Sequence, residues 1–238
     1  MAASKGYGRA LLKISGEALA GERGHGLDPT KIAWIANEIA QAHHQGHELG
    51  VVVGGGNFLR GSDAASVGVP TLVGDQMGMI ATCLNSMALR WAIEAAGVSA
   101  RAMSAFPVGS FIEPFERERA LEYVQSGAVV IFAGGTGNPC FTTDSAAALR
   151  AVEIDAKVMV KATQVAGVFD KDPRKHPDAT FFESISPQEV LDRRLAVIDA
   201  ACIEILGRKS IPTIVLNLHE AGNIQKALSG EKVGTIII

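Results

Sequence analysis

Residues 129–144 read VVIFAGGTGNPCFTTD, an apolar run followed by a loop of small and hydroxyl-bearing residues. The run at 129–132 does not alternate with polar residues, which is typical of a strand covered on both faces in an α/β sheet. The glycines that follow leave the backbone open to a ligand, and the threonines add short hydrogen-bonding groups. The stretch predicts a strand that delivers a binding loop to the carboxyl edge of a sheet, where ligands bind in open α/β folds. An ordinary strand-to-helix turn with Asp144 as N-cap explains the same residues.

Apolar strands and amphipathic helices alternate on both sides of this stretch. The expected strands are residues 10–14, 51–53, 100–103, 129–132, 157–160, 213–216 and 235–238. The expected helices are residues 28–44, 77–96, 117–125, 187–192, 199–207 and 224–228, with a further one after Asp144. This alternation favours an α/β protein, a three-layer α/β/α sandwich with a mainly parallel central sheet. We expect one domain over residues 1–238, with residues 169–187 as a long surface excursion.

The composition is that of an ordinary globular protein with a slightly acidic balance. The chain has 238 residues, of which 47% are hydrophobic and 20% charged, and its formal net charge is -3. This balance argues against a nucleic-acid interface, which needs clustered basic residues. The three cysteines lack metal-ligand spacing and indicate free thiols in a reducing compartment, so we expect a cytoplasmic protein. No stretch approaches the roughly 18 apolar residues of a membrane span, and no signal peptide is expected.

A second glycine cluster, GGGN at 54–57, follows the expected strand at 51–53. Neither a GxxxxGK[ST] nor a GxGxxG motif is present, so the two commonest phosphate-binding motifs are absent. The consecutive amides of the cluster would nonetheless form an anion site at the end of a strand, and Arg60 follows within reach. A simple turn is the alternative interpretation.

Lys13 interrupts the first apolar run. A charged side chain in a buried strand is costly unless its ammonium reaches a partner, such as a phosphate at the strand end. Phosphoryl transfer needs positive groups around the migrating phosphoryl, and Lys13, Arg60, the glycine amides and magnesium would supply them. Asp144 could then hold the lysine in place, and Asp75 could accept ribose hydroxyls. The alternatives are a Lys13 that extends to solvent and aspartates that serve as helix N-caps.

His43, His44 and His47 raise the question of a metal site. Gly46 falls between them at the end of the expected helix, and no carboxylate or cysteine completes a ligand set. We therefore expect a solvated surface there and no metal site made by the protein.

Five motifs in order along the chain resemble the amino acid kinase family, in its bacterial branch that phosphorylates UMP. They are KISGEAL at 13–19, GGGN with Arg60 and Gly61, GDQMGMIAT at 74–82, GTGNPCFTTD at 135–144 and KATQVAGVFDKDP at 161–173. The resemblance implies the amino acid kinase fold and transfer of the γ-phosphoryl of ATP to UMP, giving UDP for pyrimidine nucleotide synthesis.

The resemblance also assigns roles to matching positions. Asp199 matches a recurring acidic position that organises the site, and it completes a catalytic set with Lys13, Arg60 and Asp144. The positions that match the ATP site are Lys13, Ile14, Ser15, Gly16, Gly56, Arg60, Thr163, Phe169 and Asp172. The positions that match the UMP site are Gly55, Asp75, Thr136, Gly137, Asn138, Pro139, Cys140, Phe141, Thr142 and Thr143.

Regulation and assembly are further implications of the resemblance. The segment linked in many bacterial members to activation by GTP corresponds to Gly21, Glu22, Arg23, Gly24, His25 and Gly26. Family members are similar in forming hexamers, commonly with inhibition by UTP. We therefore expect a homohexamer that uses ATP, UMP and magnesium, responds to GTP and UTP, and requires neither nucleic acid nor a membrane.

The chain departs from the family pattern at three places. Cys140 stands where an aromatic residue is usual, and Ala166 stands where an aspartate is common. Phe58 and Leu59 reverse the usual aliphatic and aromatic order before Arg60. None of these departures removes a charge that we assign to chemistry.

Two other functions stay open. One is a family member that phosphorylates a carboxylate or carbamate, such as an acetylglutamate kinase, against which the loop at 135–144 and the chain length argue. The other is a nucleotide-sensing regulator that has lost catalysis, which the intact Lys13, Arg60 and Asp144 disfavour.

Overall fold

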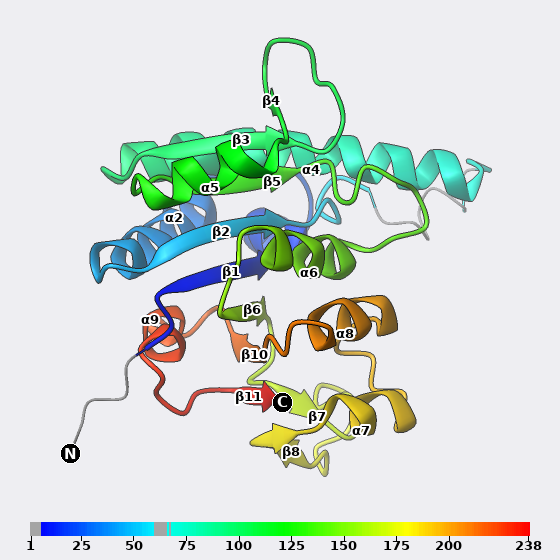
Figure 1. Cartoon of the computed structure of the whole chain (residues 1–238). Coiled ribbons are helices and arrows are strands. Elements are labelled where there is room, and N and C mark those ends of the chain that lie inside the picture. The colour runs from blue at the N-terminus through cyan, green and yellow to red at the C-terminus, as the bar shows by residue number, and fades with distance from the viewer. Residues whose placement is uncertain (1–5, 60–65, 67) are drawn as a thin grey trace.

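The computed structural model describes residues 6–59, 66 and 68–238, and their main feature is a nine-stranded sheet (Figure 1). Its strand order is β4 (Glu113–Pro114), β3 (Ala100–Ser104), β5 (Val129–Ala133), β2 (Glu48–Val53), β1 (Arg9–Ile14), β6 (Val158–Thr163), β10 (Thr213–Asn217), β11 (Thr235–Ile237) and β9 (Ser184–Ile185). Neighbouring strands are parallel except for the antiparallel pair β10 and β11. A separate antiparallel pair joins β7 (Val168–Phe169) to β8 (Phe181–Phe182).

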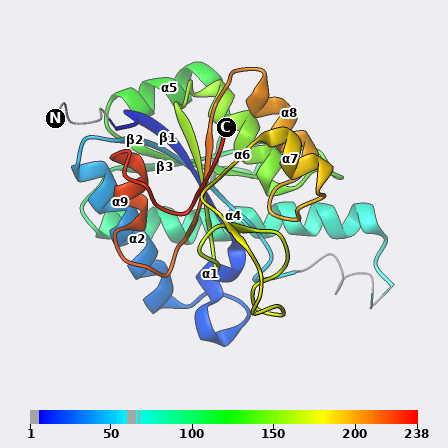
Figure 2. The ribbon, with the colours of Figure 1, turned by 90° about the horizontal axis from the view of Figure 1, so that it is seen from below.

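Helices cover both faces of this sheet (Figure 1 and Figure 2). One face carries α1 (Gly16–Ala20), α2 (Pro29–His44), α4 (Thr71–Ala95) and α9 (Asn223–Leu228). The other face carries α5 (Arg117–Gln125), α6 (Thr143–Glu153), α7 (Pro187–Asp192) and α8 (Ala200–Gly207). The predicted three-layer sandwich with a mainly parallel sheet is confirmed. Within the described residues, no helix is long and apolar enough to cross a membrane.

Strand β1 shows why the sheet needs a helix layer on each side. Ala10, Leu12 and Ile14 are buried in the core on the α2 face, whereas Leu11 is buried in the core on the α6 face. Side chains of a strand alternate between faces, so Lys13 shares the α6 face with Leu11. Its position under a helix layer is what makes this charge unusual.

The largest difference from the expected elements is at α4. We expected a helix over residues 77–96, but α4 begins at Thr71. The first turns carry no start signal, because Pro70 gives no side-chain cap and Gly74 and Gly78 disfavour a helix. The N-cap alternative for Asp75 is therefore wrong, since this residue lies inside the helix. The excursion at 169–187 also holds the short strands β8 and β9.

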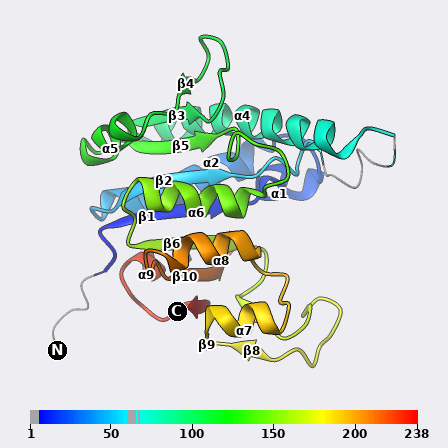
Figure 3. The same ribbon diagram turned by 45° about the vertical axis from the view of Figure 1, so that its right-hand side comes forward.

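The parallel strands bring several loops to one edge of the sheet. Strands β1, β2 and β5 end on the same side of the molecule (Figure 3). The start of α1, the glycine cluster after β2 and the loop after β5 therefore gather at this edge, where the candidate site lies.

Candidate active site

Two buried lysines share one carboxylate at this edge. Lys13 in β1 and Lys161 in β6 are register partners on adjacent parallel strands. The Nζ of Lys13 lies 2.8 Å from Oδ1 of Asp144, and the Nζ of Lys161 contacts Oδ2 of Asp144 and donates to the carbonyl of Val197. The side chains of Lys13, Asp144 and Lys161 are only 10%, 11% and 13% exposed. Two ammonium groups against one carboxylate leave an excess positive charge, which favours an anion such as phosphate.

The charges of this cluster shift its pKa values. Burial opposes ionisation of the Asp144 carboxyl, but the charges of Lys13 and Lys161 outweigh it and hold the pKa of Asp144 below its ordinary value. Burial lowers the pKa of Lys161, and although Asp144 acts in the opposite direction, the charge of Lys13 lowers it further. An arriving anion would favour the charged form of Lys161 and so bind more tightly.

The first turn of α6 positions the Asp144 carboxylate next to the two lysines. Thr142 is the N-cap, because its hydroxyl accepts from the amides of Asp144 at 3.0 Å and Ser145 at 3.4 Å. The N-cap interpretation of Asp144 is therefore wrong: it is the second residue of the helix, and its carboxylate faces Lys13 and Lys161.

Asp199 ties the starts of α6 and α8 together. It is the N-cap of α8 and accepts from the amide of Cys202 at 2.7 Å. It also accepts from the hydroxyls of Ser145, at 2.9 Å, and Thr142. This geometry suits a residue that positions Asp144 through α6 rather than one that touches reacting groups.

A cavity of about 160 Å³ lies between the glycine cluster, α4 and the loop after β5. Six of the ten positions expected for UMP line it, namely Gly55, Asp75, Asn138, Pro139, Phe141 and Thr143. The other four, Thr136, Gly137, Cys140 and Thr142, are not among its lining residues. Because ligand pockets usually measure about 300–1,000 Å³, a whole nucleotide would extend from this cavity over the surface around it. Thr143, which lines the cavity, is the residue just before Asp144, so the cavity lies close to the lysine cluster.

Asp75 holds the loop that faces it across this cavity. Its Oδ2 accepts from the amide of Cys140 at 2.8 Å. Cys140 has a φ of 70°, in the left-handed region that non-glycine residues rarely adopt. We expected the Asp75 carboxylate to accept ribose hydroxyls. In the structure it also holds the backbone of the loop after β5, which we call the acceptor loop (residues 134–142).

A larger cavity of about 480 Å³ adjoins the lysine cluster, because Lys161 lines it. The three positions expected around the ATP nucleoside, Thr163, Phe169 and Asp172, line it as well. Its wall also contains four basic residues, Lys171, Arg174, Arg193 and Arg194. The acidic residues of this wall are Asp170 and Asp172, so basic residues are in excess, and a cavity of this size with that excess suits a polyphosphate nucleotide.

Close packing explains the glycines at the ends of β1 and β2. A Cβ on Gly16 would lie 2.6 Å from the carbonyl oxygen of Gly54, and a Cβ on Gly55 would lie 2.5 Å from the carbonyl oxygen of Gly78. The segment from Ile14 through Ser15, the residue before α1, thus lies directly against the glycine cluster that contains Gly56. The positions expected for ATP phosphates are brought together, except Arg60, which lies outside the described residues.

Two buried asparagines lie behind the glycine cluster. The Nδ2 of Asn85 donates to Oδ1 of Asn57 at 2.7 Å and to the carbonyl of Gly54 at 2.6 Å. The Nδ2 of Asn57 donates in return to Oδ1 of Asn85 at 2.9 Å and to the carbonyl of Gly26 at 2.7 Å. Gly26 ends the segment expected to respond to GTP, and its amide donates to the carbonyl of Asn57 at 2.8 Å. This segment, with a 3₁₀ turn at Gly21–Arg23, is therefore joined directly to the glycine cluster.

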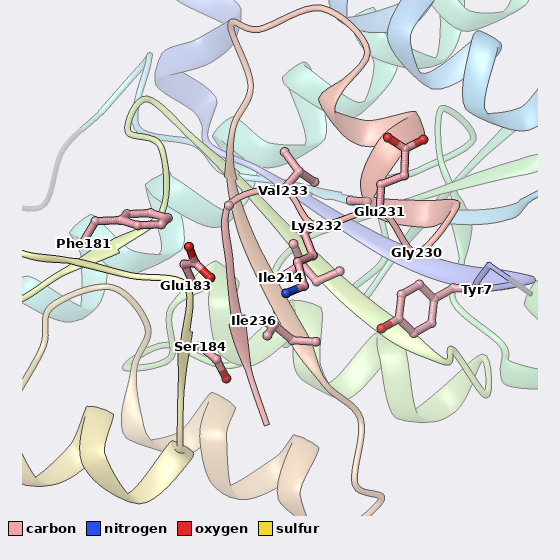
Figure 4. Close-up of a pocket in the computed structure, with 12 residues that line it drawn as sticks. Tyr7, Phe181, Glu183, Ser184, Ile214, Gly230, Glu231, Lys232, Val233 and Ile236 are labelled. Atoms are coloured by element: carbon pink, nitrogen blue, oxygen red, sulfur yellow. The ribbon is translucent and has the colours of Figure 1, made fainter. Parts of the chain in front are cut away.

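Another cavity, of about 450 Å³, lies on the opposite face of the sheet from Lys13, near β11 (Figure 4). Tyr7, Phe181, Ile214 and Ile236 contribute apolar surface to its wall. None of the residues predicted for the site lines it, and we assign it no part in the chemistry.

The sequence analysis assigned no role to Lys161 or Asn85. The signal for Lys161 was present, because VMVKAT at Val158–Thr163 is an apolar strand interrupted by one charge, like the strand of Lys13. The sequence offers little indication of a role for Asn85, because its hydrogen-bond partner Asn57 lies 28 residues away and no pattern links the two. In the part of the chain that the structure describes, no group of three or more His, Cys, Asp or Glu could hold a metal ion.

The chain is similar to known proteins over most of its length. The model of the amino acid kinase family matches residues 8–217. A uridylate kinase from Brucella anthropi is 48% identical over 237 residues, covering 100% of this chain and 99% of the relative. A uridylate kinase from Rhizobium etli is 48% identical over 231 residues, covering 97% of this chain and 96% of the relative.

Solved structures of UMP kinases are also similar to this chain. The UMP kinase from Bacillus anthracis superposes with a TM-score of 0.94 at 34% identity, covering 98% of this chain and 96% of the other. The UMP kinase from Ureaplasma parvum has a TM-score of 0.90 at 32% identity, with 98% and 99% covered. The chain therefore belongs to the amino acid kinase family.

Proposed function

We propose that this chain is a UMP kinase that transfers the γ-phosphoryl of ATP to UMP, forming UDP and ADP for pyrimidine nucleotide synthesis. The observation that carries the proposal is the buried pair of lysines on Asp144, with Lys161 in the wall of the larger cavity and Thr143, next to Asp144, in the wall of the smaller one. The choice of UMP as acceptor rests on the uridylate kinases that match the whole chain.

The reaction needs charge stabilisation more than proton transfer. A phosphate oxygen of UMP attacks the γ-phosphorus of ATP and forms the new P–O bond. The bond from the γ-phosphorus to the β–γ bridging oxygen breaks, and ADP leaves with the electron pair. The attacking oxygen is already anionic at neutral pH, so no general base is required. Lys13 and Lys161 would stabilise the charge that develops on the transferring group.

The acidic residues would act by positioning. Both carboxylate oxygens of Asp144 face ammonium groups, so Asp144 would orient the two lysines rather than accept a proton. Asp199 would hold the start of α6 through Thr142 and Ser145. Arg60 is assigned to the ATP phosphates by resemblance alone.

Magnesium would enter the site as part of the ATP substrate. Mg²⁺ in kinase sites is held mostly by phosphate oxygens and water, with one or two carboxylates at most, and it neutralises phosphate charge. Because Asp144 and Asp199 are already engaged, the residues of this chain would mainly bind and orient the nucleotide.

The remaining expectations belong to the same proposal. The chain would act as one domain in a cytoplasmic homohexamer, with GTP as activator and UTP as inhibitor. The double hydrogen bond between Gly26 and Asn57 supports a route from the segment at 21–26 to the glycine cluster.

The test is phosphoryl transfer from ATP with magnesium to UMP, CMP, dUMP and N-acetylglutamate, each with and without GTP. We expect UDP to form from UMP and faster turnover with GTP. If N-acetylglutamate were the only acceptor that is phosphorylated, the protein would be a kinase of a carboxylate and the proposal of UMP as acceptor would be wrong. Failure with every acceptor, from protein that binds UTP, would favour the regulator that has lost catalysis.

A further inference from the structure

Helix α4 contacts two neighbouring parallel strands, β2 and β5 (Figure 1). The two strands pair in register, with Val52 opposite Phe132. The first residue after β2 is Gly54 and the first after β5 is Gly134. Because parallel strands in register end together, the glycine cluster and the acceptor loop start side by side.

Two buried side chains of α4 hold these two starts. The Nδ2 of Asn85 donates to the carbonyl of Gly54 at 2.6 Å. The Oγ1 of Thr82 accepts from the amide of Gly134 at 2.8 Å. Residues three apart on a helix are neighbours on one face. One face of α4 therefore holds the first residue after each strand, and the helix fixes the glycine cluster and the acceptor loop relative to each other.

The hydroxyl of Thr82 is oriented for its contact. It donates to the carbonyl of Met79 at 2.7 Å, which leaves a lone pair of the oxygen for the amide of Gly134. Thr82 is only 2% exposed, and Gly134 is buried as well. A buried amide that loses its acceptor is costly. Removal of the hydroxyl would therefore favour a displaced loop start that returns this amide to solvent.

The end of β3 encloses Gly134 on another side. Its φ of 80° lies in the left-handed region, and a Cβ there would lie 2.8 Å from the ring of Phe106 and 3.0 Å from the hydroxyl of Ser104. The amide of Gly137 donates to the carbonyl of Gly134 at 3.0 Å and closes the first turn of the acceptor loop. A displacement of Gly134 would therefore move this whole turn.

The far end of the acceptor loop is held by the same helix. Asp75, which accepts from the amide of Cys140 at 2.8 Å, is seven residues before Thr82, about two helical turns away on the same face. Between these two contacts, Thr136 and Asn138 hydrogen-bond to each other. The middle of the loop is thus ordered from within, and its position over the cavity depends on its two ends.

We propose that Thr82 is a positioning residue of the acceptor site, whose hydroxyl holds the start of the acceptor loop in the place where the loop binds UMP. Thr82 lines the 160 Å³ cavity. Its hydroxyl is already engaged by Met79 and Gly134, so it acts through the loop rather than on the acceptor itself. Asn85 makes the corresponding contact for the glycine cluster, on the donor side. The assignment rests on the proposed function.

The first experiment compares the KM for UMP with the KM for ATP in three variants. Thr82→Val keeps the shape of the side chain and removes the hydroxyl, whereas Thr82→Ser keeps the hydroxyl. The matched control is Ser86→Ala, because Ser86 is buried one turn further along α4 and its hydroxyl donates to a carbonyl of the same helix, that of Thr82, at 2.8 Å.

We expect Thr82→Val to raise the KM for UMP about tenfold, the size of effect that one lost buried hydrogen bond produces, and to change the KM for ATP less than about twofold. Thr82→Ser and Ser86→Ala should keep both KM values within about twofold of wild type. An equal rise of both KM values in Thr82→Val overturns the proposal, because it would indicate a general distortion. Failure of Thr82→Ser to keep the KM for UMP overturns it too, since the effect would not depend on the hydroxyl.

A thermal melt separates positioning from a purely structural role. If Thr82 only stabilised the fold, Thr82→Val would melt at a lower temperature and keep the wild-type KM for UMP, and this result would overturn the proposal. Should Thr82→Val not fold, Thr82→Ala, which also lacks the hydroxyl, takes its place in every comparison.

Hydrogen exchange measured by mass spectrometry tests the position of the loop without a substrate. Peptides from the acceptor loop should exchange faster in Thr82→Val than in wild type, and at the wild-type rate in Thr82→Ser and Ser86→Ala. Unchanged exchange in Thr82→Val overturns the proposal. Absence of UMP phosphorylation by the wild type would instead refute the proposed function, and hydrogen exchange would still decide whether Thr82 holds the loop.

Discussion

Lys13 and Lys161 lie opposite each other on β1 and β6, and their ammonium groups contact opposite oxygens of the single carboxylate of Asp144. Parallel pairing of the two strands fixes this arrangement, because register partners point to the same face of a sheet. The lysines therefore form one unit whose orientation depends on the carboxylate between them. Loss of any member should affect the other two.

Replacing Lys13 by methionine removes a charge and keeps most of the buried volume. We expect kcat to fall by roughly 10²–10³, because a preorganised group that stabilises transition-state charge is lost. The matched control is Lys157→Met, since Lys157 is an exposed lysine just before β6. The measurement is UDP formation under saturating ATP and UMP, with a thermal melt to check folding. Wild-type turnover in a folded Lys13→Met protein would contradict the assignment.

The pKa of Lys161 predicts how activity responds to alkaline pH. Burial favours the neutral amine and lowers the pKa of Lys161 below its ordinary value of 10.5. The ammonium is thus lost at a lower pH than for an exposed lysine, and turnover should fall as pH rises through that pKa. Arginine stays protonated, so whatever activity Lys161→Arg retains should lack this alkaline decline. A kcat profile with the same alkaline limb in wild type and Lys161→Arg would assign the decline to another group.

The pKa of Asp144 predicts how stability responds to acid. Its folded-state pKa lies below the ordinary value of 3.8, so its stabilising contribution is complete above 3.8 and is lost as pH falls through the folded pKa. At neutral pH we expect Asp144→Asn to lower the free energy of unfolding by about 3–5 kcal/mol, because two buried ammonium groups lose their partner. The difference from wild type should shrink below pH 3.8. Urea unfolding at several pH values measures it.

An exposed ion pair provides the control for this experiment. Asp178 pairs with Lys171 at 2.6 Å, but its side chain is 77% exposed. Asp178→Asn should therefore change the free energy of unfolding by less than about 1 kcal/mol. Equal effects of the two substitutions would show that the buried pair contributes no more than a surface pair.

Pattern and composition were sufficient for the α/β/α architecture, because the buried strands leave apolar runs in the sequence and glycine clusters follow β2 and β5. Lys13 could be singled out for the same reason, as a charge within such a run. The partner Lys161 was missed, since strand order cannot be read from the chain and β1 lies between β2 and β6. The start of α4 was missed because Gly74 and Gly78 contradict helix propensity, and tertiary contacts at the acceptor cavity override it.

Asn85 offers a test of the amides behind the glycine cluster. Asn85→Ala removes the donor to the carbonyl of Gly54 and both side-chain hydrogen bonds between Asn85 and Asn57, so we expect a loss of roughly 1–3 kcal/mol in the free energy of unfolding. The KM for ATP should rise at the same time, because the backbone of Gly54–Asn57, which includes Gly56, would no longer be held in place by Asn85. Asn37→Ala, at an exposed position of α2, is the control and should change neither quantity. A stability loss with an unchanged KM for ATP would limit Asn85 to a structural role.

Cys140 combines a strained backbone with a place in the acceptor loop. Its φ of 70° is tolerable for a small unbranched side chain and poor for a β-branched one, so Cys140→Val should destabilise the protein by about 1–2 kcal/mol. Glycine accepts this conformation without strain, and Cys140→Gly should keep near-wild-type stability. Because the amide of Cys140 donates to Asp75, distortion by valine should also raise the KM for UMP, whereas glycine should preserve it. Urea unfolding and UMP titrations of both variants measure these effects. Equal KM values for the valine and glycine variants would show that the loop conformation at Cys140 does not control the acceptor site.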